Sequence, residues 1–203
     1  MRTEAAPPVV RAARADDEDD AVRLLLESGG VVYPRFAGSS EAALRTLRAG
    51  FRRPGNTASA EIVTVAELDG EVAGVIAAFP VLEGAVRARR YLRVSLARMP
   101  LWRWPNAWRI FASLRPTPPP HALYVDAVAT SGDFRRRGVA SALLEAAATK
   151  AREQGCTHLA LETELENSAA RSLYRSAGFE ETGTLPPVER GLGEGYVCLV
   201  KAL

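Results

Sequence analysis

The chain has 203 residues, of which 47% are hydrophobic and 25% are charged, and its formal net charge is +2. This length predicts a single domain over residues 1–203, with room for an insertion. The composition excludes a disordered tail, a collagen-like chain and a small scaffold built on disulfides. The near-neutral total also weighs against a protein that is dedicated to nucleic-acid binding through a strongly basic surface.

The charges are distributed unevenly along the chain. From Gly84 to Val125 there is no Asp or Glu, so this stretch carries +8 and the rest of the chain carries −6. Its eight arginines are Arg87, Arg89, Arg90, Arg93, Arg98, Arg103, Arg109 and Arg115. All three tryptophans of the chain, Trp102, Trp104 and Trp108, lie in the same stretch. The basic stretch is therefore a candidate contact for an acidic acceptor or partner.

Cysteine and histidine are too sparse to predict a metal site. Cys156 and Cys198 are isolated and have no Cys-x-x-Cys spacing, and His121 and His158 are far apart in the sequence. This cysteine usage favours a reducing compartment. No apolar run approaches the ~20 residues of a membrane span, and the N-terminus lacks the apolar region of a signal peptide. We therefore expect a cytoplasmic protein without a metal.

Helix and hairpin signals organise the chain up to residue 80. Acidic residues or serines precede the expected helices, and Asp69-Gly70 is a strong hairpin signal between two β-rich runs. The expected elements are a strand at 9–13, a helix from Asp16 to Gly30, a helix that follows Ser39 and Ser40, a loop at 51–60, and strands at 61–68 and 71–79.

The basic stretch predicts a helical insertion at about 81–120. Apolar residues recur every three or four positions between Ala85 and Met99, which predicts a helix that ends at Pro100. Tryptophans continue this spacing in a second short element at 104–111. A stiff proline run over 116–120 then leads out of the insertion.

Strands and helices alternate after the insertion. The expected elements are a strand at 122–129, a helix at 137–154, a strand at 158–162, a helix at 167–177, and a last strand near 196–200. This alternation indicates a partly parallel sheet with helices packed on it, and the earlier hairpin makes the sheet mixed. The predicted fold class is α+β.

The junction between the strand at 122–129 and the next helix has features of a pyrophosphate site. The helix begins at a basic segment that contains Gly138 and the small Ala140. The first N–H groups of a helix are free and lie at the positive end of its dipole, and small residues let a ligand approach the backbone. The segment is neither a nucleotide P-loop nor a dinucleotide fingerprint, because the required lysine and further glycines are missing. A plain basic helix start is the alternative.

A second group of residues lies on the predicted helix at 167–177. Asn167 is a good N-cap, and Ala170 and Tyr174 lie three and seven residues later on the same helix face. The side chains on this face are small where the helix begins, and Tyr174 places a phenol there two turns later. An ordinary amphipathic helix with a core tyrosine and a glycine C-cap is the alternative.

Together, the two groups resemble the GNAT superfamily of acyl-CoA-dependent N-acetyltransferases. Its pyrophosphate motif, Arg/Gln-x-x-Gly-x-Gly/Ala, and its second signature are matched by Arg135, Gly138 and Ala140, and by Asn167, Ala170, Tyr174, Gly178 and Phe179. The match covers about 121–185, and the hairpin at 61–79 resembles the second and third strands of the fold. The loop at 130–133 departs from the family, in which Val and Pro are common there. The insertion at 81–120 has no counterpart in the minimal fold.

The resemblance implies a mixed, centrally splayed sheet flanked by helices, with the helical insertion between its third and fourth strands. Acetyl-CoA is then the acyl donor, and its pantetheine arm lies in the split between the strands at 122–129 and 158–162. The residues implied in its binding are Val128, Ala129 and Thr130 beside the arm, Arg135, Arg136, Arg137, Gly138, Val139, Ala140 and Ser141 at the pyrophosphate, and Asn167, Ala170 and Tyr174 on the other side of the arm.

The expected reaction transfers acetyl directly from the thioester to a primary amine of a small molecule or protein. Tyr174 is the expected acid for the leaving thiolate, because a thiol has a pKa of about 8.5. A backbone N–H near Val128 would stabilise the thioester oxygen. Asp126 and Glu162 are the candidate bases, and water is a third. Asp126 alternates with Tyr124 and Val128 along its strand, and Glu162 ends the neighbouring strand.

Several interpretations of the insertion stay open. As a lid, its arginines would favour an acceptor with carboxylate or phosphate groups. It would otherwise form a homodimer contact through 84–115, bind weakly to an anionic membrane or nucleic acid, or simply pack its apolar side chains on the sheet. No specific nucleic-acid site and no membrane span are expected. The alternative to an enzyme is a non-catalytic acyl-CoA-binding sensor or interaction module.

Overall fold

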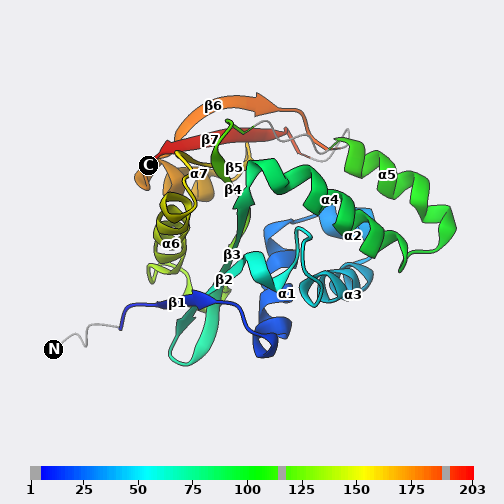
Figure 1. Ribbon diagram of the computed structural model, residues 1–203, viewed down its shortest axis with the longest axis horizontal. Coiled ribbons are helices and arrows are strands. Elements are labelled where there is room, and N and C mark those ends of the chain that lie inside the picture. The colour runs from blue at the N-terminus through cyan, green and yellow to red at the C-terminus, as the bar shows by residue number, and fades with distance from the viewer. Residues whose placement is uncertain (1–5, 114–117, 189–192) are drawn as a thin grey trace.

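The computed structural model describes residues 6–113, 118–188 and 193–203, and a seven-stranded sheet forms its centre (Figure 1). The strand order is β1-β2-β3-β4-β5-β7-β6, and β4 and β5 run parallel whereas the other neighbouring strands run antiparallel. The strands are β1 (Val9–Ala12), β2 (Val63–Leu68), β3 (Glu71–Pro80), β4 (Ala122–Thr130), β5 (His158–Glu164), β6 (Glu180–Leu185) and β7 (Tyr196–Ala202). The predicted mixed sheet and α+β class are confirmed.

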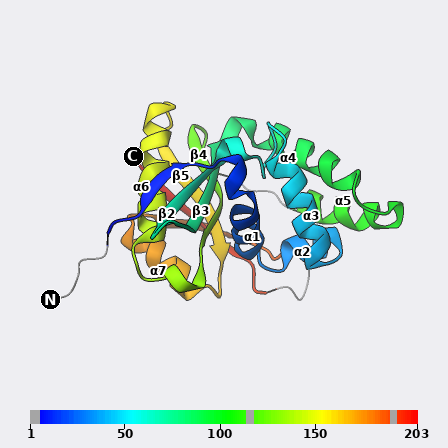
Figure 2. The ribbon, with the colours of Figure 1, turned by 90° about the horizontal axis from the view of Figure 1, so that it is seen from below.

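Helices cover both faces of this sheet. The helices are α1 (Glu18–Ser28), α2 (Val32–Ala37), α3 (Ser40–Phe51), α4 (Val81–Leu96), α5 (Trp104–Ser113), α6 (Val139–Glu153) and α7 (Ser168–Ser176). The first five lie on one face, and α6 and α7 lie on the other (Figures 1 and 2). Within the described ranges, no helix is both long and apolar enough to cross a membrane.

The apolar run of β3 explains why both faces of the sheet are covered. Val75 and Ala77 pack in the cluster beneath α1 and α3, whereas Ile76 packs in the cluster beneath α6. Successive side chains of a strand point to opposite faces, so a strand that is apolar from Val72 to Phe79 must be buried on both sides. Asp69 and Gly70 form the tight turn before β3, with φ values of +56° and +84°.

The insertion lies between β3 and β4, as predicted, and consists of α4, α5 and the short turn that joins them. Helix α4 begins after Pro80 and ends before Pro100. Ala107 and Ile110 bury one side of α5. Arg115 and the first residues of the expected proline run lie outside the described residues. The sequence does not predict α2, because six residues are too few to show a helical period.

Strands β4 and β5 pair along only the first part of their length. Ala122–Val125 pair with His158–Leu161, and the pairing stops there. Both strands continue beyond this point, β4 to Thr130 and β5 to Glu164. Beyond this point, the backbone edges of β4 and β5 face each other across an opening and form no hydrogen bonds with one another. This opening, called the split below, is the central splay that the family resemblance implies.

A β-bulge interrupts β4 where the split begins. The register between β3 and β4 shifts between Ala77 and Ala78, so Asp126 has no partner on β3. A bulge places two residues opposite one and re-aims the side chains that follow. As a result, Tyr124 packs against the cluster beneath α1, whereas Val128 packs against the cluster beneath α6. The simple alternation expected for Tyr124, Asp126 and Val128 is therefore wrong.

Candidate functional site

The N-terminus of α6 follows β4 after a short loop and presents free backbone donors. Gly138 is the N-cap, with a φ of +80°, and its carbonyl accepts from Ala142 N–H at 3.0 Å. This is the first bond of the helix, so the N–H groups of Val139, Ala140 and Ser141 have no acceptor within it. A Cβ built on Gly138 would meet no atom within 4 Å. Donors that face open space at a helix start suit an anionic group.

The three arginines before Gly138 have different surroundings. Arg137 donates to Asp69 at 2.8 Å, and its guanidinium lies 5.4 Å from the centroid of the Phe134 ring. These contacts tie the loop to the turn between β2 and β3. Arg135 and Arg136 are exposed, and their side chains have no hydrogen-bond partner within the described part of the chain. Arg135 and Arg136 are thus available to an anion, whereas Arg137 anchors the loop.

Close packing against β3 fixes the position of the free donors of α6. A Cβ built on Gly74 of β3 would lie 2.6 Å from Val139 Cγ1 and 2.8 Å from the Ala129 carbonyl oxygen. Only a residue without a side chain fits this contact, which brings the first turn of α6 onto the sheet. Val128, Ala129 and Thr130 pair with β3 through one edge, and their other edge faces the split. That edge offers backbone groups to the amides of an extended ligand.

The residues of the second signature lie along α7, the helix that follows β5. Asn167 caps the helix, because its side-chain oxygen accepts from Ala170 N–H at 3.1 Å. The Tyr174 ring is buried 5.7 Å from the Phe179 ring, and burial raises the pKa of the Tyr174 phenol to about 12. The phenol is therefore protonated at neutral pH. Its hydroxyl has no hydrogen-bond partner among the described residues, so its proton is free to be donated.

Asp126 lies on the bulge at the mouth of the split. Its side chain is exposed there, with protein close on the remaining sides. This partial loss of hydration raises the pKa of the Asp126 carboxyl to about 7, and the negative charge of Glu162 adds to the rise. Water in the split screens part of both effects. Asp126 therefore changes charge near neutral pH, the range that suits a general base.

Glu162 is held on the β5 side of the split by a tyrosine of β4. The Tyr124 hydroxyl donates to Glu162 Oε2 at 3.2 Å. Burial raises the pKa of the Glu162 carboxyl, and this hydrogen bond opposes the rise. Glu162 also stands opposite Cys198 in the pairing of β5 with β7, and burial together with the Glu162 charge raises the pKa of the Cys198 thiol. The structure thus brings the two candidate bases close enough to influence each other.

Two tyrosines that the sequence does not single out share the surroundings of Asp126. Tyr33 of α2 and Tyr91 of α4 form an edge contact, with ring centroids 6.4 Å apart. Burial raises the pKa of both phenols, and the charge of Asp126 contributes to each rise. No motif marks these residues, because three distant segments must fold together to bring them near Asp126.

The donor set around the split fits a pantetheine arm and a pyrophosphate. It consists of a free strand edge, helix N–H groups and two exposed arginines, which are suited to amides and phosphates. In the described ranges, no three His, Cys, Asp or Glu side chains are grouped to hold a metal ion. Glu164 is the last residue of β5, and its carboxylate lies near Gly30 in the turn before α2. It adds a further carboxylate to the β5 side of the split.

Two curated proteins share part of this sequence. The chain is 41% identical over 56 residues to N-alpha-acetyltransferase 30 of Saccharomyces cerevisiae, which is 28% of this chain and 32% of that protein. It is 51% identical over 47 residues to aminoglycoside N(6')-acetyltransferase type 1 of Klebsiella aerogenes, which is 23% of this chain and 31% of that protein. Each match thus spans about a third of the relative's length.

Solved structures share the fold across nearly the whole chain. One crystal structure of an acetyltransferase has a TM-score of 0.73 at 23% identity and covers 96% of this chain and 98% of that chain. An N-acetyltransferase from Staphylococcus aureus Mu50 has a TM-score of 0.70 at 18% identity, with 95% and 99% covered. The family model "Acetyltransferase (GNAT) family" matches residues 33–179, well over half of the chain. The chain therefore belongs to the GNAT acetyltransferase family.

Proposed function

We propose that this protein is an N-acetyltransferase that moves the acetyl group of acetyl-CoA directly to a primary amine. The observation that supports the proposal best is that the split between β4 and β5 opens toward the free N–H groups of α6. A strand edge then continues into an anion-binding helix start, which matches a ligand made of an amide arm and a pyrophosphate. The two cysteines are free thiols, in keeping with the cytoplasmic location that we propose.

The chain's own groups bind the donor along its length. Acetyl-CoA supplies the acetyl group as a thioester. The N–H groups of Val139–Ser141 and the side chains of Arg135 and Arg136 hold the pyrophosphate. The free edge at Val128–Thr130 pairs with the amides of the arm, and the start of α7 at Asn167 lines its other side.

Three groups carry the chemistry. Asp126 takes a proton from the acceptor ammonium, whose pKa is ordinarily near 10, so that the neutral nitrogen attacks. The C–N bond forms and the C–S bond breaks, while a backbone N–H near Val128 stabilises the thioester oxygen. The nitrogen then loses its second proton to water in the split, which leaves a neutral amide. Tyr174 donates its proton to the departing sulfur, and its raised pKa keeps that proton available at neutral pH. Glu162 stays bonded to Tyr124 and holds the acceptor by charge.

The carboxylates favour a cationic acceptor over an anionic one. Asp126, Glu162 and Glu164 place negative charge on the acceptor side, and the half-buried Tyr33 ring adds aromatic surface for a cation. The matched relatives are named for acetylating α-amino groups and an aminoglycoside amine. A polyamine, an aminoglycoside and a peptide with a free N-terminus are therefore the acceptor classes to compare.

A thiol-release assay with these three amine classes tests the enzyme against the alternative of a binding module. An acetyltransferase releases CoA thiol only when a suitable amine is present. Calorimetry with acetyl-CoA alone gives the independent measure of binding. Tight binding without release by any amine class would favour the sensor, whereas absent binding would contradict both functions.

A further inference from the structure

The start of α5 and the turn before it expose large apolar side chains to water. The exposed fractions are 71% for Leu101, 80% for Trp102 and 59% for Trp108. Trp104 is 41% exposed, and its indole N–H donates to the Leu96 carbonyl at 3.2 Å, which fixes the turn against α4. Clustered apolar side chains of this size, left open to water, mark a contact surface.

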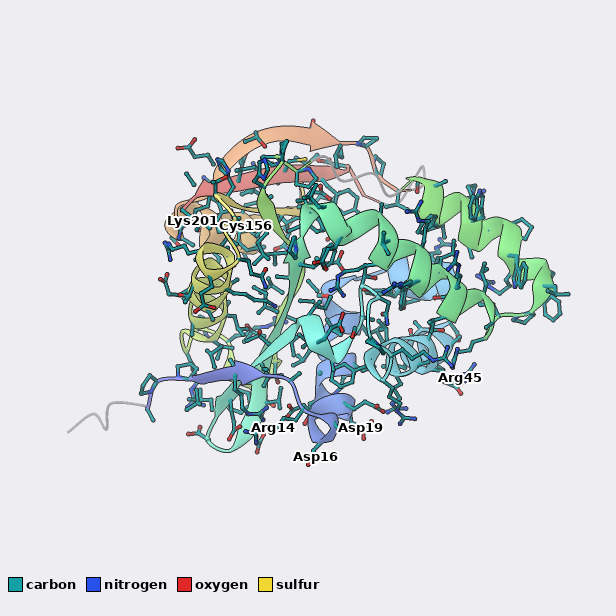
Figure 3. All side chains as sticks on the ribbon, in the orientation of Figure 1. Arg14, Asp16, Asp19, Arg45, Cys156 and Lys201 are labelled. Atoms are coloured by element: carbon teal, nitrogen blue, oxygen red, sulfur yellow. The ribbon has the colours of Figure 1, made fainter. Side chains whose placement is uncertain are left out.

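A cationic depression of about 570 Å³ adjoins this segment. It lies over α3 and reaches Arg98, which follows α4 in the turn that leads to Leu101. Figure 3 shows Arg45 on α3 beside this turn. The lining residues are Ala42, Arg45, Thr46, Arg48, Ala49, Arg52, Arg53 and Arg98. Five of these eight residues are arginines and none carries a carboxylate, so the depression suits anionic groups.

The positive charge of the depression is only partly balanced. Three arginines pair with carboxylates outside the lining: Arg45 with Glu41, Arg48 with Asp19 and Arg52 with Glu18. Exposed ion pairs are weak and exchange readily for other partners. Arg53 and Arg98 have no carboxylate partner within the described part of the chain. The turn and α5 add no acidic residue, since the stretch from Gly84 to Val125 contains none.

Exposed Trp and Leu beside arginines match the boundary of an anionic bilayer. Tryptophan favours the headgroup level, apolar side chains enter the acyl boundary, and arginines bind lipid phosphates. We propose that Leu101, Trp102, Trp104 and Trp108, together with Arg53 and Arg98, form a lipid-docking surface that holds the protein on an anionic membrane.

Two other occupants satisfy this surface less well. A second copy bound through the same surface would set arginines against arginines, because a two-fold contact is self-complementary. A single-stranded nucleic acid would use the arginines and would stack on the tryptophans, but it offers nothing to the aliphatic Leu101 side chain. Of these three occupants, the bilayer alone combines an apolar interior for the Trp and Leu side chains with negative charge for the arginines.

The three tryptophans make the test direct, because the chain has no other tryptophan. Intrinsic fluorescence of the full chain is recorded with vesicles of phosphatidylcholine alone and of equal parts phosphatidylcholine and phosphatidylglycerol. We expect a shift of emission to shorter wavelength, and co-sedimentation, with the anionic vesicles only. Added salt should weaken the binding, because the lipid surface charge is screened.

Charge and apolar variants separate the two parts of the surface. Arg53→Glu with Arg98→Glu should weaken partitioning by about 25-fold or more, at roughly a factor of five for each basic side chain lost. Trp102→Ala should weaken it several-fold, with Trp104 and Trp108 still reporting. Arg152→Glu on α6, at the opposite face of the sheet, is the matched control and should bind like the parent. Acetyl-CoA binding should be unchanged in all of these variants, which confirms that they fold.

Distinct results would overturn the lipid-docking surface. The proposal fails if anionic vesicles leave the emission unchanged, or if phosphatidylcholine vesicles shift it equally. A shift that depends on protein concentration without vesicles would assign the surface to a second copy. A shift with single-stranded RNA but not with vesicles would assign it to nucleic acid.

Discussion

Asp126 occupies its position because one extra residue in β4 breaks the pairing with β3. The bulge turns the carboxyl to the mouth of the split, near Glu162, Tyr33 and Tyr91. Carboxyl groups ordinarily have a pKa near 4, and a carboxylate with so low a pKa is a poor base for an ammonium. The pKa of about 7 at Asp126 brings its titration into the range where general bases are most effective.

The base role of Asp126 predicts a pH-dependent rate. A base acts in its deprotonated form, so kcat/KM should rise with pH through about 7 as Asp126 ionises. Asp126→Asn should lower kcat by about a hundredfold and remove this limb of the profile. Steady-state kinetics across neutral pH, with the best amine found, measures both effects. An unchanged limb in the variant would assign the base to Glu162 or water.

Asp126→Asn should lower activity but raise stability, and the stability measurement serves as the control for folding. The pKa of Asp126 is higher in the folded than in the unfolded chain, so folding is favoured at acid pH and loses this advantage as pH rises through about 7. Asp126→Asn should therefore raise Tm above neutral pH and leave it nearly unchanged at pH 4. Thermal unfolding at both pH values shows whether lost activity reflects lost structure.

Tyr174→Phe isolates the acid. Phenylalanine keeps the ring and its 5.7 Å contact with Phe179, so the fold should persist while the donated proton is lost. We expect kcat to fall by about a hundredfold, with little change in the Kd for acetyl-CoA. Turnover at the parent rate would remove Tyr174 from the mechanism.

At the scale of elements, the two ends of α6 form a natural pair for testing the pyrophosphate site. Gly138 precedes the helix and Gly155 follows it, with φ values of +80° and +70°. A Cβ on either glycine meets nothing within 4 Å. An alanine at either position therefore has a similar backbone cost of roughly 1–2 kcal/mol, but only Gly138 lies in the proposed site.

Gly138→Ala should weaken acetyl-CoA binding by about tenfold, because its methyl group enters the space in front of the free N–H groups. Gly155→Ala should lower Tm to a similar degree and leave the Kd unchanged. Calorimetric titration of both variants provides the comparison. Equal Kd values in the two variants would place the pyrophosphate elsewhere.

A partly buried ion-pair network joins β1, β2 and the start of α1. Arg11 donates to both oxygens of Asp17 at 2.7 and 2.8 Å and to Glu67 at 3.0 Å. Asp17 also accepts from Arg14 N–H at 2.7 Å. The hydrogen bond from Arg11 is the largest contribution that lowers the pKa of the buried Asp17 carboxyl.

Asp17→Asn should lower the free energy of unfolding by about 1–3 kcal/mol at neutral pH, the worth of hydrogen bonds to a charged group. The pKa of Asp17 is lower in the folded state, so its contribution is fully present above the unfolded value near 4 and is lost as pH falls through the folded value. The difference between parent and variant should therefore shrink in acid. Urea unfolding over pH measures it, and Glu41→Gln in the exposed pair with Arg45 should change stability by less than about 0.5 kcal/mol.

At the scale of the whole molecule, β2, β3 and β4 contribute side chains to both apolar clusters. Neither cluster keeps its packing if the other loses these strands. We expect one cooperative unfolding transition, with equal calorimetric and van't Hoff enthalpies. Leu47→Ala in one cluster and Leu143→Ala in the other should each lower the single Tm, and two resolved transitions would contradict a single domain.

The sequence predicts the fold well where its signals are local. Asp69-Gly70 sets a hairpin, the apolar spacing of 139–153 sets α6, and Asn167 caps α7 as expected. The location of the insertion follows from the hairpin before it and the strand after it. Helix α2 is missed because so short a helix depends on packing against its neighbours.

The site is predictable only in part, for a physical reason. Backbone features such as the start of α6 depend on a few adjacent residues, and the sequence identifies them. The surroundings of Asp126 depend on the register between strands and on segments as distant as Tyr33 and Tyr91. A one-residue bulge reverses which side chains share a face of the sheet. The residue type at Asp126 gives no signal of this bulge.

The incomplete pairing of β4 with β5 has a consequence for the architecture itself. A seven-stranded sheet ordinarily has two borders, but this sheet has four along part of its width, because the split adds an inner border on each side. Unpaired strand borders are vacancies for an extended backbone. A ligand whose amides fill this vacancy acts as a short eighth strand. The substrate would then supply some of the hydrogen bonds that hold the two halves of the sheet together. These bonds would break when the product leaves and form again when the next substrate binds.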